Sequence, residues 1–436
     1  MIHESLDWKD AAERRFCEYL EAIAGVLGHA DRREPMHAYC TGLLLPGKRK
    51  SVEPMAARIA PQRVQAAHQS LHHFVAQAEW RDEAVLDVVR ARVLPLIERH
   101  GPIRHWIIDD TGVPKKGKHS VGVARQYCGQ LGKQDNCQVT VTLSVANEHA
   151  SLPIAYRLYL PEPWTADHER RGRAGVPEDI VFQTKPQIAL AQVRAAVETG
   201  VPRGVVLSDA GYGNDTDFRT GLTEQGLLYV VGVQSSTSLW PPGQGPLPPK
   251  PWRGKGPLPK RMRRDEGHQP TSALDVANDL PAQGWRTIRW REGTNAALSS
   301  RFAAVRVRPA HRDYRLSEPH PQEWLLIEWP EGETEPTKYW LSTVPADTSM
   351  TDLVAAAKGR WRIERDYRDL KQEVGLGHFE GRGWRGFHHH ASLCIAAYGF
   401  LVAERCLFPP EQRFQTKQLA APAIPAGYRP RGTHSP

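Results

Sequence analysis

The order of strand-like and helix-like segments between residues 103 and 233 limits the fold of this chain more than any other feature. Three strand-like runs come first, "IRHWIIDDTGV" (103–113), "NCQVTVTLSVAN" (136–147) and "SLPIAYRLYLP" (151–161). The middle run alternates strictly, with Val139, Val141, Leu143 and Val145 on one side, a pattern typical of a half-buried strand. The third run is expected to be its antiparallel neighbour.

Helices and strands then alternate. The pattern predicts a helix at 185–200, a strand at 203–209, a helix at 215–226 and a strand at 227–233. Three strands followed by this alternation are the order expected of a ribonuclease-H-like α/β core. We therefore predict an α/β fold whose core begins at 101–233.

The flanking segments differ in character. Residues 1–100 read as a helical N-terminal region, because apolar residues recur every three or four positions in 11–28 and 81–100. Residues 234–335 combine a Pro/Gly-rich arm with further strand-like runs, so we expect a β-rich insertion that interrupts the core. The core then resumes at 336–408, and 409–436 reads as a flexible tail.

Charge and cysteine content narrow the functional class. The 436 residues contain 57 Lys and Arg against 49 Asp and Glu, which gives a net charge of +8 and favours a polyanionic partner. The six cysteines form no CxxC pair, as expected of reduced thiols in the cytosol. The longest apolar-rich run, 391–404, is too short to span a bilayer, so we expect a cytoplasmic protein without membrane contact.

Three acidic residues stand where a metal site would need them. Asp109 and Asp209 end strand-like runs, and Glu364 lies in a charged, helix-like segment, 358–373. Ligand sites in α/β sheets gather at the carboxyl ends of strands, and carboxylates suit Mg²⁺ or Mn²⁺. A pair of such ions can promote cleavage of a phosphodiester bond. Each acid alone is more often a cap or a solvated charge, and Glu373 is a weaker candidate for the third position.

The chain resembles the DDE transposases of bacterial insertion sequences, in particular the group with a β-rich insertion and a Y-R-E-K signature. The resemblance covers roughly residues 36–405. It rests on "DDTG" with "PKKGKHSVGVARQYCGQLGK" behind it, on "LSDAGYG", on "RWRIERDYRDLK" and on "YCTGLLLPGKRKSVEPMA". The sequence contains no phosphate-binding loop, which a kinase or an oxidoreductase would need.

The resemblance implies the function and the partners. It implies Asp109, Asp209 and Glu364 as ligands of two Mg²⁺ or Mn²⁺ ions, with Arg360 and Lys371 of the signature binding phosphates. It further implies double-stranded DNA as partner for element ends and target, a homodimer in the DNA complex, a DNA-binding N-terminal region and a nucleoid-associated location. Other basic residues expected to contact DNA are Arg368, Lys115, Lys116, Lys118, Arg261, Arg263 and Arg264.

Two positions depart from the family pattern or leave it ambiguous. Ala357 stands where the signature has Tyr, so Tyr367, one turn after Glu364, is a candidate substitute in holding the DNA end. Asp109 and Asp110 are adjacent and point to opposite faces of a strand, and Asp109 is the preferred first ligand. Two other functions stay open, a ribonuclease-H-fold nuclease without strand transfer and a non-catalytic DNA-binding regulator descended from a transposase.

Overall fold

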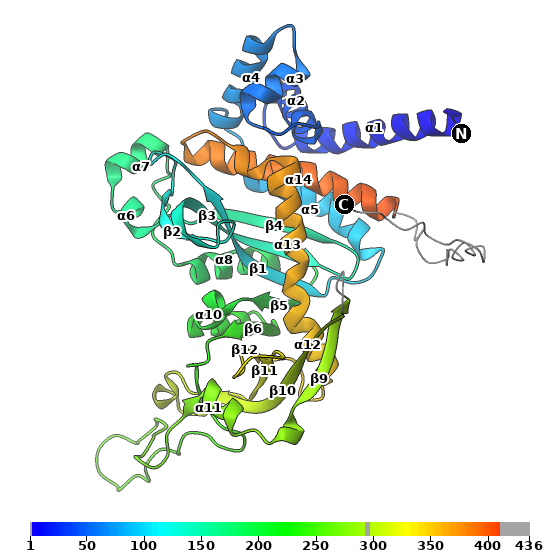
Figure 1. Ribbon diagram of the computed structural model, residues 1–436. Coiled ribbons are helices and arrows are strands. Elements are labelled where there is room, and N and C mark those ends of the chain that lie inside the picture. Colours follow the sequence, from blue (N-terminus) through cyan, green and yellow to red (C-terminus); the bar gives the residue numbers. More distant parts are fainter. Residues whose placement is uncertain (1, 293–296, 410–436) are drawn as a thin grey trace, which may run out of the picture.

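A single mixed sheet organises the chain, which a computed structural model describes at residues 2–292 and 297–409 (Figure 1). The strands follow the order β2-β3-β1-β5-β6-β12-β11-β10-β7-β8, with β4 on β3 and β9 on β10. Their bounds are β1 His105–Pro114, β2 Ala124–Cys128, β3 Lys133–Ala146, β4 Ser151–Leu158, β5 Val205–Ser208, β6 Tyr229–Val233, β7 Ser238–Trp240, β8 Thr271–Ser272, β9 Arg286–Glu292, β10 Ala297–Pro309, β11 Glu323–Trp329 and β12 Lys338–Ser342.

The strand pairing of the first half follows the predicted order. β3 lies antiparallel to β1 and to β4, whereas β5 lies parallel to β1 and to β6. The strands predicted within 103–233 are all present, and so are the helices α8 (Lys185–Glu198) and α10 (Thr216–Glu224). β2 and the short helices α6 (Glu162–Thr165) and α7 (His168–Ala174) were not foreseen.

The half-buried character expected for the strand at 136–147 is wrong, because both faces of β3 are covered. Its residues from Cys137 to Ala146 are all buried. On one face α8 packs against the strand, and Gln192 donates a hydrogen bond to the carbonyl of Val141. On the other face Tyr367 lies against it, with its hydroxyl 3.5 Å from Ser144 Oγ. Small hydroxyl residues between the valines leave room for these helices.

The N-terminal region is helical, as predicted, and packs on the C-terminal helix. It comprises α1 (Ile2–Ala24), α2 (Arg33–Leu44), α3 (Val52–Ile59), α4 (Val64–Ala76) and α5 (Asp82–Glu98), and its helices contact α14 (Trp384–Leu407). The histidines 388–390 lie in the second turn of α14. All three rings are buried and bond to backbone carbonyls or to Tyr39, so these histidines do not form a surface for a partner.

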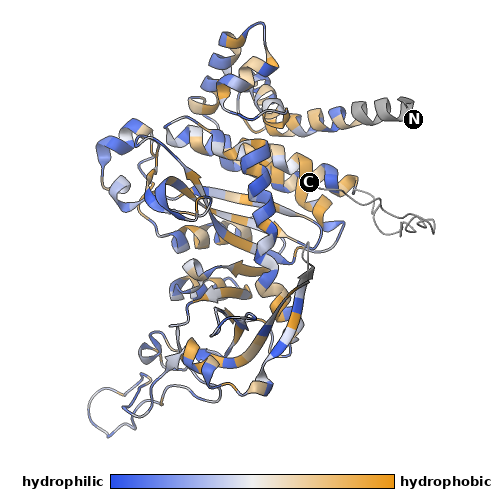
Figure 2. Cartoon of the chain, in the orientation of Figure 1, coloured by the Kyte–Doolittle hydropathy of each residue, from blue (hydrophilic) through white to orange (hydrophobic). Residues whose placement is uncertain are grey.

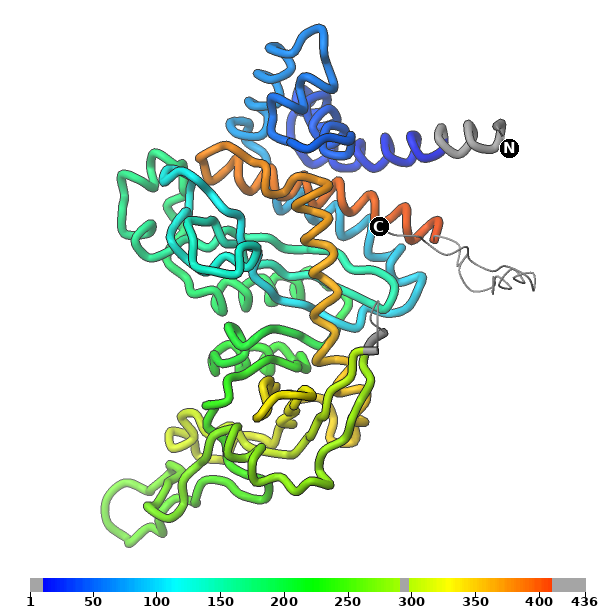
Figure 3. The backbone as a smooth tube through the Cα atoms, in the orientation of Figure 1, coloured from blue at the N-terminus to red at the C-terminus, as the bar shows by residue number. Residues whose placement is uncertain are grey.

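The segment from 350 to 374 crosses the sheet between the insertion and α14, and Figure 3 traces its path. The expectation of one helix over 358–373 needs correction. After α12 (Met350–Lys358) the chain makes a 3₁₀ turn, η4 (Gly359–Trp361), then the α-helix α13 (Arg362–Asp369), and then a π-helical turn, η5 (Leu370–Val374). Figure 2 shows α13 as a hydrophilic helix across more hydrophobic strands.

The insertion continues the same sheet. β12 pairs with β6 on one side and with β11 on the other, so the strands predicted near 286–329 extend the core sheet. The Pro/Gly-rich stretch also contains β7, β8 and the helix α11 (Ala273–Asn278), which the composition did not suggest. No helix in the described ranges is long and apolar enough to cross a membrane. The tail predicted at 409–436 lies, from residue 410 on, outside the described residues.

Candidate active site

The register between β1 and β5 brings the first two predicted acids together. Ile107 pairs with Leu207 in this parallel ladder, so Asp109 on β1 and Asp209, which directly follows the end of β5, both come two residues after this pair. Asp209 keeps an extended backbone, and neighbouring strands lie about 4.8 Å apart. Because side chains alternate along a strand, both carboxylates follow the direction of Ile107 and Leu207. The two acids therefore form a pair.

Arg360 faces this pair from the 3₁₀ turn. Its Nη1 donates to Asp109 Oδ2 at 2.5 Å, and the backbone N–H of Asp110 donates to Asp109 Oδ1 at 2.8 Å. Gly359 permits this approach, since a Cβ there would lie 3.1 Å from Leu207 Cδ1 and 3.3 Å from His105 Cε1. A larger residue would lift the turn from the sheet and move the guanidinium away from Asp109.

The two acids differ in environment. Burial raises the pKa of Asp109 to about 6, Arg360 opposes the shift, and the nearby Asp209 and Asp110 add to it. Asp209 is exposed and caps the short helix α9 (Ala210–Gly213) by accepting a hydrogen bond from Gly211 N at 2.9 Å. One carboxylate is therefore held inside the fold and the other is open to a ligand.

Asp110 points to the opposite face. Lys185 Nζ donates to one of its carboxylate oxygens and the Tyr212 hydroxyl donates to the other. Burial, then Asp110, Asp109 and Asp209, raise the pKa of Tyr212 well above its ordinary value, so the phenol remains a donor. These contacts agree with the preference for Asp109, and not Asp110, as the acid on the side of α13.

Glu364 lies on α13 one turn after Arg360, and its side chain is exposed. Arg360 and Lys371, on the same stripe of this segment, both interact with the charge of Asp109. The three predicted acids nevertheless do not form a closed cluster, because no group of three metal-ligating side chains occurs within 2–292 and 297–409.

The pair of carboxylates suits a hard divalent cation. Mg²⁺ prefers oxygen ligands, keeps several of its waters and needs only one or two protein carboxylates. Asp109 and Asp209 supply such oxygens from a rigid sheet. The partial exposure of Asp209 leaves room for water and for a phosphate.

Tyr367 does not replace the missing signature tyrosine, and that hypothesis is wrong. Its side chain is 7% exposed, and its hydroxyl lies against Ser144 on β3. Its neighbour Asp366 is also buried and accepts hydrogen bonds from Ser151 Oγ and from the Tyr398 hydroxyl. Both residues fix α13 to the strands and to α14.

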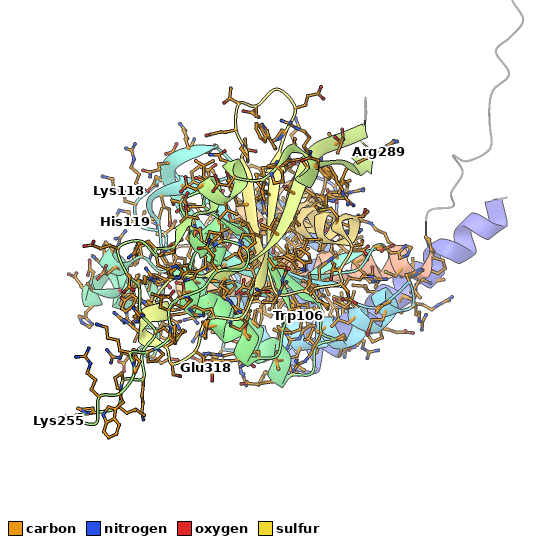
Figure 4. The ribbon with its side chains drawn as sticks, turned by 90° about the horizontal axis from the view of Figure 1, so that it is seen from below. Trp106, Lys118, His119, Lys255, Arg289 and Glu318 are labelled. Atoms are coloured by element: carbon orange, nitrogen blue, oxygen red, sulfur yellow. The ribbon has the colours of Figure 1, made fainter. Side chains whose placement is uncertain are left out.

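The basic residues predicted to contact DNA fall into two groups. Lys115 donates to the carbonyl of Phe379, and Arg263 and Arg264 pair with Asp265 and Asp313. Burial lowers the pKa of Lys115 to about 8. In contrast, the side chains of Lys116, Lys118, Arg261 and Arg368 are exposed, and Figure 4 shows Lys118 at the periphery. The side chains of the second group are therefore the more accessible to a partner.

Three residues of this site escaped sequence reasoning. Gly359, Lys185 and Tyr212 act through contacts with residues far away in the chain, which local patterns do not encode. The glycine directly before Arg360 was the one available signal. A cavity of about 740 Å³, lined by His105, Gly204 and Ala356 among others, lies where β1 and β5 begin, so it is separate from the acid pair.

Two aspartates at the ends of neighbouring parallel strands, crossed by a highly charged helix, are the features of this site, and the sequence comparison gives the family. The chain belongs to the DDE superfamily endonucleases, whose family model matches residues 22–297. It is also similar to a "Probable transposase for insertion sequence element IS701" of Microchaete diplosiphon, with 30% identity over 222 residues. That match covers 51% of this chain and 53% of the relative, so the chain spans about half the length of the curated relative it matches. The predicted family is confirmed.

Proposed function

We propose that this protein is the transposase of an insertion sequence, which binds inverted-repeat DNA ends, cleaves them and joins the 3′ ends to target DNA. The observation that carries the proposal is the in-register pair Asp109 and Asp209 with Arg360 bonded to it. The strand order β4-β3-β1-β5-β6, with the last two strands parallel to β1, supports a ribonuclease-H-like core.

The acids are proposed to work as ligands. Asp109, Asp209 and Glu364 would hold two Mg²⁺ or Mn²⁺ ions, which supply the positive charge that activates an attacking oxygen and stabilises a leaving one. Asp109 is fixed in the sheet, whereas Glu364 on α13 would close the site from its rim. Arg360 and Lys371 would neutralise phosphate charge beside the scissile bond.

DNA is the proposed partner throughout. The exposed side chains of Lys116, Lys118 and Arg368 support this proposal, and the basic arm would add a second surface for DNA. In the arm (240–264), the cations without an acidic partner among the described residues are Lys250, Arg253, Lys255, Lys260 and Arg261. We further propose that the N-terminal helices bind the element ends, that the complex holds two copies of the chain, and that it works at the nucleoid.

An assay on the element's own ends tests the proposal. The DNA flanking the gene should contain short inverted repeats bracketed by a small direct duplication. Incubation of the full chain with these ends, Mg²⁺ and a plasmid target should give 3′-end cleavage and joined product. Cleavage without joining would favour the nuclease, and binding without cleavage would favour the non-catalytic regulator.

Matched variants identify the chemistry. Asp109→Asn and Asp209→Asn should each abolish cleavage and leave end binding nearly unchanged. Asp347→Asn, at an exposed position far along the chain, is the control and should cleave normally. Full cleavage by the Asp209→Asn variant would contradict the proposed site.

A further inference from the structure

Asp110, Lys185 and Tyr212 form a cluster behind the acid pair. The two oxygens of Asp110 are each bonded, one by the ammonium of Lys185 and one by the hydroxyl of Tyr212. Lys185 is the first residue of α8, whose start is fixed by a capping box between Thr184 and Gln187. Asp110 thus has a cation and a neutral donor that both come from well-anchored helices.

Tyr212 links the cluster to the other half of the pair. It lies three residues after Asp209, inside the turn that Asp209 caps. The side chain is 2% exposed and its ring packs against Phe218, with centroids 6.0 Å apart. The next residue, Gly213, is so close to β6 that a Cβ would lie 1.9 Å from the carbonyl oxygen of Gly232. The turn therefore has little freedom to shift against the sheet.

The contacts join the two strands at the level of the acids. Asp110 follows Asp109 directly, and its backbone N–H bonds the Asp109 carboxylate. A bond from Tyr212 to Asp110 consequently ties the Asp209 turn to the Asp109 peptide by a second route, besides the pairing of β1 with β5. Residues that bond to metal ligands or to their direct neighbours hold the ligands in the geometry that a metal ion needs.

We propose that Asp110, Lys185 and Tyr212 are positioning residues that set the separation of the Asp109 and Asp209 carboxylates, and that Asp110 is not a ligand. This inference rests on the proposed metal-binding role of Asp109 and Asp209. It assigns a role to Asp110 on β1, Lys185 on α8 and Tyr212 on α9, which meet on the face of β1 that points away from α13. Their effect should appear in the affinity for the divalent ion.

Removal of a single hydroxyl provides the test. Tyr212→Phe keeps the ring packing and removes the bond to Asp110. We expect the Mn²⁺ concentration for half-maximal end cleavage to rise 10- to 100-fold, as for other partners behind metal ligands, with the rate at saturating Mn²⁺ largely retained. Direct titration of Mn²⁺ into the complex with a pre-cut DNA end should show the same loss. Lys185→Gln, at a half-exposed position, should shift both values in the same direction.

The controls separate the possible failures. Tyr127→Phe, on an exposed tyrosine of β2, should change neither value. If Asp109→Asn and Asp209→Asn leave Mn²⁺ binding intact, the proposed function itself fails. If they abolish it while Tyr212→Phe binds Mn²⁺ normally, only the positioning role is overturned. Loss of binding in Asp110→Asn that excess Mn²⁺ does not restore, with Tyr212→Phe normal, would identify Asp110 as a ligand. Thermal unfolding of every variant reports whether the fold is retained.

Discussion

Arg360 donates a hydrogen bond to Asp109 across 251 positions of the chain. We expect the same guanidinium to bind a phosphate of the DNA, so it would donate hydrogen bonds to two anions, the Asp109 carboxylate and the phosphate. Substrate binding would then redistribute its hydrogen bonds between the carboxylate and the phosphate. A planar guanidinium with five N–H donors can bond both at once, which a lysine ammonium does less well.

Removal of this guanidinium should impair cleavage more than binding. Arg360→Ala leaves the partly buried Asp109 without its cation and the phosphate without a donor. We expect cleavage to fall by about 10²-fold or more, as when one transition-state donor is lost. Arg360→Lys should recover part of the rate, whereas end binding, measured by mobility shift, should weaken only a few-fold. Equal losses in rate and binding would indicate a role in affinity alone.

The two glutamates of the charged segment should behave differently. Glu364→Gln is expected to abolish cleavage in Mg²⁺ and in Mn²⁺, because it removes a ligand from the rim of the site. Glu373→Gln, on the exposed side of η5, should cleave at the rate of the parent protein. Normal end cleavage by Glu364→Gln would exclude this residue as the third acid and leave the site with two.

Tyr367 should matter to stability and not to DNA handling. Tyr367→Phe loses the contacts of the hydroxyl with Ser144 and Thr142 and keeps the ring packing, so the free energy of unfolding should change by about 1 kcal/mol. Tyr367→Ala opens a cavity beside β3 and should cost about 3–5 kcal/mol. Chemical denaturation measures both values. End cleavage by the Phe variant should be unchanged, and a specific loss of cleavage there would restore the hypothesis of a DNA contact.

The stability should depend on pH through Asp366. Burial raises its pKa from 3.8 to about 6, opposed by the hydrogen bonds from Ser151 and Tyr398. Folding therefore favours the protonated acid, so its contribution is fully present below pH 4 and is lost as the pH rises through 6. At about 1.4 kcal/mol per unit of pKa, the loss amounts to about 2–3 kcal/mol at pH 8.

Asp366→Asn removes this dependence. Relative to the parent protein, the variant should become progressively more stable between pH 4 and pH 7, as followed by denaturant unfolding at a series of pH values. Asp347→Asn supplies the comparison at an exposed carboxylate. A constant difference for Asp366→Asn would mean that Asp366 titrates normally.

The arm should contribute to DNA binding through charge. Its tip turns at Gly254 and Gly256, both at positive φ, and Figure 4 shows Lys255 far from the sheet. Neutralisation of these five cations should reduce the slope of log affinity against log salt by up to about 4.5, at about 0.9 for each phosphate contact. Exchange of Lys and Arg at the same positions keeps the charge and should preserve the slope. An unchanged slope after neutralisation would remove the arm from the interface.

The local patterns were sufficient to predict the order of the strands along residues 103–233 and the placement of Asp109 beside Asp209. Residues 103–233 alternate between periods of two and of 3.6, and Asp109 and Asp209 follow apolar runs whose parallel pairing places them together. The same patterns could not show that Arg264 is held by the fully buried Asp313, since these residues are 49 positions apart. Nor could they show that β3 is covered on both faces, because the helices that cover it come from distant parts of the chain.

The turn types within the charged segment were equally inaccessible. A continuous helix fits the spacing of 358–373, but Gly359 allows a tight 3₁₀ turn against the sheet, and a π turn ends the segment before Gly375 at φ 90°. Both irregularities adjust which side chains face Asp109. They depend on tertiary packing, which overrides the local preference for a regular helix.

Because Val230–Val233 of β6 pair with Tyr339–Ser342 of β12, the strands β7–β11 between them cannot be removed or replaced as an independent unit. Excision of the stretch between them would remove β11 and leave that edge of β12 with an unsatisfied row of amides and carbonyls, open to pairing with another molecule. Any shortened or swapped version of this protein must therefore cover this edge of β12, and variation among natural forms should concentrate beyond β10, on the strands that lie farthest in the sheet from β1 and β5.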